Sequence, residues 1–64
     1  MEWIAKYFMA VFYREKYSIG WEEAAKKANR LVENSLENIP KESQEIVLSR
    51  IADRAETLTK LARR

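Results

Sequence analysis

The side chains that this sequence lacks limit the chemistry it can perform. The chain of 64 residues contains neither histidine nor cysteine, so acid–base or nucleophilic catalysis would fall to carboxylates, hydroxyls or lysines. Two carboxylate pairs have helical spacing, Glu33 with Glu37 and Asp53 with Glu56. Such pairs can hold metals in helical bundles, but di-iron sites also require Glu-x-x-His motifs. We therefore expect solvated charge at these positions, with no catalytic residue, no metal site, no cofactor and no enzymatic activity.

Aromatic and basic side chains offer a second chemistry, because rings can stack on bases while cations hold phosphates. All seven aromatic residues lie within the first 21 positions. Six residues are the candidate contacts for an external partner or a nucleic acid: Tyr13, Arg14, Lys16, Tyr17, Lys27 and Arg30. The basic residues fall into three clusters. The first is Arg14 and Lys16 with Tyr17, the second is Lys26, Lys27 and Arg30, and the third comprises Arg50, Arg54, Lys60, Arg63 and Arg64.

Acidic neighbours weaken these clusters as a phosphate-binding surface. Glu15 lies within the first cluster, and Glu22 and Glu23 precede the second. In a helix-turn-helix these two glutamates would enter the major groove first, where phosphates would repel them. The formal net charge is only +2. Nucleic-acid binding is therefore the alternative function and not the first one.

The first 20 residues do not resemble a membrane or secretion segment. The apolar run over residues 7–13 is much shorter than the roughly 20 residues of a bilayer span. A secretory signal would have a basic start, whereas Glu2 is acidic. An interfacial helix would have a strongly cationic polar face, and this one sets Lys6 and Lys16 against Glu2. We expect a cytoplasmic protein without a membrane partner.

Glycine and proline divide the chain into three helical segments. Breaks at Gly20 and Pro40 predict helices over residues 2–17, 20–37 and 40–62, with one kinked helix over 2–37 as the alternative. Ser18 is the candidate N-cap of the second helix. The apolar residues of the first helix cover an arc of roughly 200°, about twice the stripe of an ordinary surface helix. We expect a second copy of the chain to cover the excess, because a domain this small buries little surface by itself.

The second and third segments have faces that favour a helical hairpin. The third repeats with the heptad spacing of a left-handed bundle at Gln44, Leu48, Ile51, Ala55, Leu58 and Ala62. Small residues on the second segment, Ala24, Ala25 and Ala28, would let the third approach closely. The two segments are therefore expected to pair directly and antiparallel around the turn at residues 38–40.

A stretch around this turn resembles a known family. It comprises Ile39-Pro40-Lys41-Glu42-Ser43-Gln44, followed by Val47, Ile51, Asp53, Ala55-Glu56 and Leu58. These residues are similar to the second helix of the Rop family, plasmid RNA-binding dimers built from two helical hairpins. The resemblance implies heptad packing of a hairpin. The family's RNA-contacting residues lie on its first helix and match nothing in residues 2–37, so no site residue is carried over.

These patterns together predict an all-α bundle, with an aromatic N-terminal helix and an antiparallel helical hairpin, assembled as a homodimer. The residues expected at the oligomer interface are Trp3, Ile4, Tyr7, Phe8, Val11, Phe12, Leu48, Ile51 and Leu58. The expected function is a non-catalytic module for protein–protein interaction or assembly, with its own copy or another protein as partner. The alternative is a small nucleic-acid-binding regulator of the plasmid or phage type.

Overall fold

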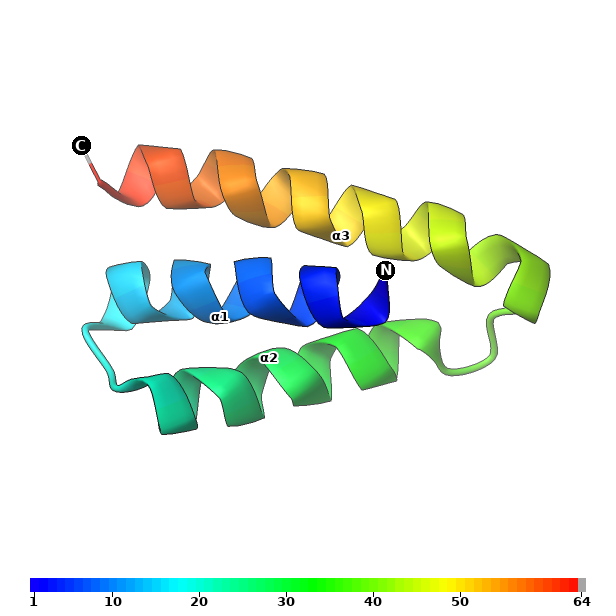
Figure 1. The fold of residues 1–64 in the computed structure, drawn as a ribbon, viewed down its shortest axis with the longest axis horizontal. Helices are drawn as coiled ribbons and strands as arrows, with labels where there is room; N and C mark the ends of the chain where they lie inside the picture. Colours follow the sequence, from blue (N-terminus) through cyan, green and yellow to red (C-terminus); the bar gives the residue numbers. More distant parts are fainter. Residues whose placement is uncertain (64) are drawn as a thin grey trace.

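Three α-helices make up the fold in a computed structural model that describes residues 1–63 (Figure 1). They are α1 (Glu2–Tyr17), α2 (Trp21–Leu36) and α3 (Lys41–Ala62). The predicted all-α class with three helices is confirmed, and residues 2–37 form two helices instead of one kinked helix. No helix within residues 1–63 has both the length and the apolar character needed to cross a membrane. Arg64, assigned to the C-terminal basic cluster, lies outside the described residues.

The break between α1 and α2 is a left-handed turn at Ser18. Ser18 has φ 54° and ψ 44°, and its backbone N–H donates to the Arg14 carbonyl at 2.9 Å. Ser18 therefore ends α1. The prediction that it caps the second helix is wrong. The N-cap of α2 is Gly20, in an extended conformation and without a side-chain hydrogen bond.

Ser18→Gly is expected to stabilise the protein. A left-handed conformation is strained for residues with a Cβ and free of strain for glycine. Glycine also has a larger backbone entropy in the unfolded chain, which offsets part of the relieved strain. We therefore expect the free energy of unfolding to rise by about 0.5–1 kcal/mol and the melting temperature by roughly 4 °C. Thermal unfolding followed by circular dichroism measures it. Ser18→Ala is the control, and an equal rise with alanine would contradict this explanation.

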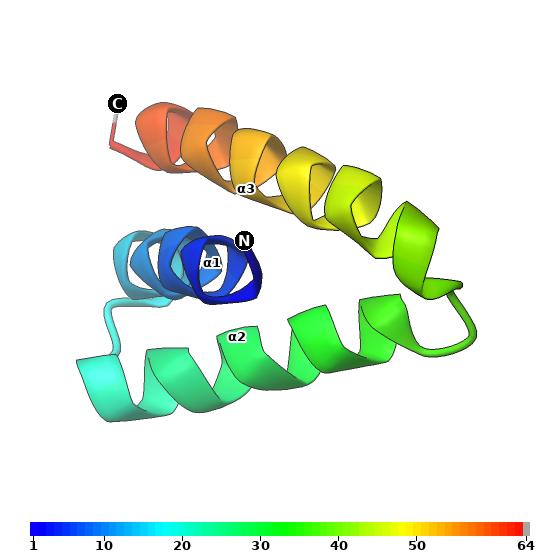
Figure 2. The same cartoon turned by 45° about the vertical axis from the view of Figure 1, so that its right-hand side comes forward.

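Helix α1 lies between α2 and α3 in both views of the ribbon (Figures 1 and 2). It runs antiparallel to α2 and parallel to α3 (Figure 1), and it contacts both along its length, whereas α2 and α3 contact each other little. The predicted direct pairing of the second and third helices is therefore wrong, although they do run antiparallel. The wide apolar arc of α1 explains the difference, since it offers two sides on which helices can pack.

Small side chains let both outer helices approach α1 closely. Ala5, Ala24, Ala28 and Ala55 are completely buried, and so is Val32. The whole set of buried apolar residues is Ala5, Met9, Ala10, Phe12, Ala24, Ala28, Val32, Leu48, Ala52 and Ala55. Seven of these ten residues are alanine or valine, so the three larger ones, Met9, Phe12 and Leu48, contribute much of the buried apolar area.

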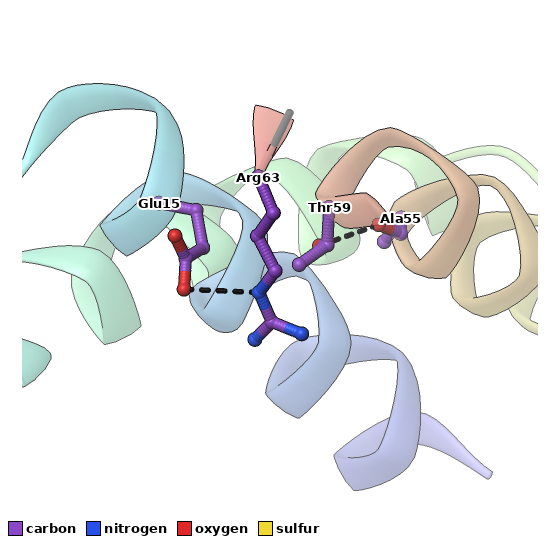
Figure 3. A network of polar contacts seen from close by, with 4 residues as sticks. All are labelled: Glu15, Ala55, Thr59 and Arg63. Atoms are coloured by element: carbon purple, nitrogen blue, oxygen red, sulfur yellow. Dashed lines mark hydrogen bonds and ion pairs between the residues drawn. The ribbon is translucent and has the colours of Figure 1, made fainter. Parts of the chain in front are cut away.

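The buried seam of α3 differs from the predicted heptad. Leu48, Ala52, Ala55 and Thr59 are buried, whereas the sequence placed Ile51 and Leu58 in the seam. Thr59 can be buried because its hydroxyl donates to the Ala55 carbonyl at 2.7 Å (Figure 3). Ile51 is displaced to the edge of the contact, where it is half-buried.

The three helices form a single layer with two broad faces. Helix α1 lies in the middle of this layer (Figure 1), and the Cα trace measures 35 × 21 × 14 Å along its principal axes. The accessible surface of the chain is 4741 Å², compared with about 4300 Å² for a typical folded monomer of this mass. Both faces of α1 are therefore available for a second layer.

Candidate functional site

Two faces with different side chains lie on opposite sides of the α3 seam. On one side, Tyr7 and Val11 of α1 line a hollow of about 190 Å³ with Glu56, Lys60 and Arg63 of α3. On the other side, Met9 of α1 lies at a groove that also includes residues of α2 and α3. We call the first the aromatic face, defined by Trp3, Tyr7, Val11 and Trp21. The second is the basic face, defined by Met9, Lys27, Arg30, Leu31, Ile51, Arg54 and Leu58.

The aromatic face contains a stack of three planar groups. The rings of Tyr7 and Trp21 are 6.2 Å apart between centroids, with 13° between their planes. The guanidinium carbon of Arg14 lies 4.4 Å from the centroid of Trp21, and Arg14 Nε donates to the Ile19 carbonyl at 3.4 Å. Trp3, one turn before Tyr7, is 71% exposed. The stack therefore fixes Tyr7 and Trp21 in place beside a tryptophan that the protein itself does not cover.

Ion pairs border the aromatic face along α1 and α3. Arg63 Nε donates to Glu15 Oε1 at 3.1 Å and joins the C-terminal ends of these helices (Figure 3). Lys60 pairs with Glu56 at 3.8 Å on the same side of α3. Acids and bases are therefore equal in number along this edge.

At one end of the basic face, two tyrosines and two cations line a hollow of about 350 Å³, here called the tyrosine hollow. Its residues are Tyr13, Tyr17, Lys27, Arg30, Leu31 and Asn34. The rings of Tyr13 and Tyr17 stack at 5.9 Å between centroids. Burial raises the pKa of the Tyr13 hydroxyl, and Tyr17 adds to the rise. The hydroxyl of Tyr13 is thus a neutral hydrogen-bonding group, next to two positive charges.

The centre of the basic face is an apolar groove between α2 and α3, here called the central groove. Met9, Leu31, Ile51, Arg54 and Leu58 line this space of about 230 Å³. Met9 is buried, Ile51 and Leu58 are half-buried, and Leu31 is 36% exposed. Leu31 belongs to both the central groove and the tyrosine hollow, so the two spaces are neighbours on the basic face.

The residues expected at an oligomer interface fall into three groups. Phe12 and Leu48 are buried within the core of one chain. Ile51 and Leu58 lie in the central groove. The remaining five lie on or beside the aromatic face: Trp3, Ile4, Tyr7, Phe8 and Val11.

Four of the six residues expected to contact an external partner gather in the tyrosine hollow: Tyr13, Tyr17, Lys27 and Arg30. The other two lie elsewhere. Arg14 is held on Trp21, and the Lys16 ammonium lies 5.3 Å from the centroid of Tyr17 and 5.6 Å from that of Phe12.

Sequence reasoning missed the role of Leu31 and Arg54 in the basic face. Leu31 follows Ala28 by three residues and Ala24 by seven, which places all three on one face of a helix and predicts that the leucine is covered. The available signal was the recurrence of Ile51, Arg54 and Leu58 at three and four residues, which puts them on one side of a helix. The spacing alone does not predict whether another helix covers this side of α3.

The carboxylates considered for catalysis do not converge. Glu33 pairs with Lys6 at 3.6 Å, and Glu56 pairs with Lys60. Within residues 1–63 there is no group of three or more candidate ligands close enough to hold a metal ion. Glu33 and Glu56 are thus each engaged with a lysine.

Comparison with known protein families, characterised proteins and solved structures gives no significant match.

Proposed function

We propose that this protein is a non-catalytic assembly module that forms a homodimer through its aromatic face. The observation that carries the proposal is the exposure of Trp3 beside the stacked rings of Tyr7 and Trp21, which are 53% and 48% exposed. Large exposed apolar patches on a folded chain mark interaction sites. Tryptophan and tyrosine are also the residues that most often dominate interface energies.

The single-layer fold supports a second copy as the partner. Domains are normally built from two packed layers that share one core, and this chain supplies only one. A face of 35 × 21 Å is close in size to the roughly 800 Å² that each partner buries in a standard interface. Packing two aromatic faces together would therefore produce a two-layer bundle of ordinary thickness.

Charge favours the aromatic face over the basic face for self-association. A two-fold dimer places the same patch against itself, so a patch of mixed charge can pair with its own copy while a patch of one sign is repelled. Glu15 and Glu56 balance Lys60 and Arg63 beside the aromatic face. No carboxylate lines the two hollows of the basic face that contain Lys27, Arg30 and Arg54, although Asp53 lies with Arg54 in a neighbouring hollow.

Sedimentation equilibrium over a range of micromolar concentrations tests this proposal. The expected species is a dimer with twice the chain mass of 7.6 kDa. Trp3→Glu is expected to raise the dimer dissociation constant at least about 100-fold, because each substitution counts twice in a two-fold interface and a buried aromatic ring contributes about 1.5–3 kcal/mol. The variant should keep its helical circular dichroism, since Trp3 is largely uncovered in one chain.

Tyr17→Glu is the matched control, because Tyr17 is 52% exposed but lies in the tyrosine hollow on the basic face. It should remain dimeric. The proposal would be refuted if the wild-type chain stayed monomeric when its concentration was raised 100-fold above the lowest one studied. It would also be refuted if Trp3→Glu dimerised as strongly as wild type.

A nucleic-acid-binding regulator is the second candidate, and the tyrosine hollow is the observation in its favour. Stacked rings beside two cations resemble the combination that single-stranded nucleic acids require. A gel shift with RNA and duplex DNA at low salt tests it, and binding should weaken steeply as salt rises.

A further inference from the structure

The basic face is an open groove with an apolar floor and cationic borders. The central groove and the tyrosine hollow meet at Leu31. Lys27 and Arg30 of α2 border one side, and Arg54 of α3 borders the other. The residues that line the two spaces include no carboxylate.

The cations that border this groove form no ion pair among the described residues. Within the described residues, the cations in ion pairs are Lys6, Lys26, Lys60 and Arg63. Lys27, Arg30 and Arg54 take part in none of these pairs. Three cations outside any of these ion pairs therefore lie around the exposed Leu31, although Asp53 lines a separate hollow with Arg54.

We propose that the basic face binds an amphipathic helix with acidic edges from another protein. A helix laid along α1 would contact both α2 and α3 and would complete a four-helix arrangement. Its apolar residues, spaced three to four apart, would pack on Met9, Leu31 and Leu58, as in other helix-in-groove complexes. Its carboxylates would pair with the cations on the two borders, which gives the interface its specificity.

The charge of the face decides between this occupant and the others. A second copy of this chain would bring Lys27, Arg30 and Arg54 against the same residues of its partner in a two-fold contact, and like charges there would repel. A nucleic acid would meet stacked rings only at the tyrosine end, because the lining of the central groove is aliphatic apart from Arg54. An amphipathic helix with acidic edges can pack its apolar face on the floor of the groove and pair its carboxylates with the cations on the two borders.

Fluorescence anisotropy with synthetic helical peptides of about 18 residues, or five turns, tests the proposal. The probe has leucines along one face and glutamates beside them. One control replaces the glutamates with lysines, and another replaces the leucines with serines. We expect the probe to bind the full-length protein with a dissociation constant of about 10 µM, and each control peptide to bind at least tenfold more weakly.

Leu31→Glu should weaken binding of the probe at least tenfold. Ile46→Glu is the matched control, because Ile46 is an exposed apolar residue of α3 that lines neither space, and its affinity should equal that of wild type. Trp3→Glu should also bind the probe normally, so that failure of the homodimer proposal can be told apart from failure of this one. Equal binding of either control peptide, an equal effect of Leu31→Glu and Ile46→Glu, or binding of a single-stranded RNA without binding of the probe would overturn the inference.

Discussion

Phe12→Ala is expected to lower the free energy of unfolding by about 3–5 kcal/mol. The seven aromatic residues all lie in the described part of the chain, and Phe12 is the one among them that is buried, with 8% of its surface exposed. Domains of this length are stable by roughly 3–10 kcal/mol in total. The variant should therefore be largely unfolded or close to its unfolding midpoint at 25 °C, as measured by urea denaturation with circular dichroism at a fixed protein concentration.

Tyr17→Ala provides the matched comparison for this loss. Tyr17 is on the same helix but 52% exposed, and exposed substitutions usually change stability by no more than about 0.5 kcal/mol. If Phe12→Ala unfolded at the same urea concentration as Tyr17→Ala, Phe12 would not lie in the core, and the placement of α1 between the other helices would be wrong.

The locations of the helices were predictable because local residues set them. Gly20 and Pro40 interrupt the helical pattern, and the observed helices begin at Trp21 and Lys41, directly after them. The left-handed turn at Ser18 was not predictable, because serine has no preference for that conformation. Local rules thus identified the break but not the residue that makes it.

The covered part of α1 could not be read from periodicity. The apolar arc includes both Trp3 and Phe12, yet one is 71% exposed and the other 8%. An arc of roughly 200° exceeds what one neighbouring helix can cover, so the positions of two neighbours decide which residues are buried. Those positions depend on contacts between distant segments, which a projection of one helix does not contain.

The same limit explains why the candidate site was predicted only in part. Tyr13 and Tyr17 were singled out as aromatic residues that could act together with cations, and they do meet Lys27 and Arg30 in one hollow. Leu31 shares its helix face with the buried Ala24 and Ala28, so its spacing alone predicts a covered position. Its exposure follows from the separation of α2 and α3 by α1, which leaves the groove between the outer helices open.

A peptide of residues 20–64, which lacks α1, is expected to have no cooperative fold. This is the direct test of the corrected helix arrangement, because a self-sufficient hairpin of the second and third helices would fold without the first. In the structure these helices make few contacts with each other and pack on α1 instead. Helices of 16 and 22 residues have only marginal stability when isolated in water. The ellipticity at 222 nm should therefore fall well below that of the full chain, and urea should produce a gradual change without a sigmoidal transition.

Adding a synthetic peptide of residues 1–19 in equal amount should restore part of the lost helix signal, because it supplies both packing surfaces that α2 and α3 use. The same peptide with Phe12→Ala should restore much less, since it lacks the large buried ring of α1. A sigmoidal urea transition for residues 20–64 alone would mean that the Ala24 and Ala28 face pairs directly with α3. In that case α2 and α3 would form a stable hairpin without α1, and α1 would only pack on a hairpin that is already folded.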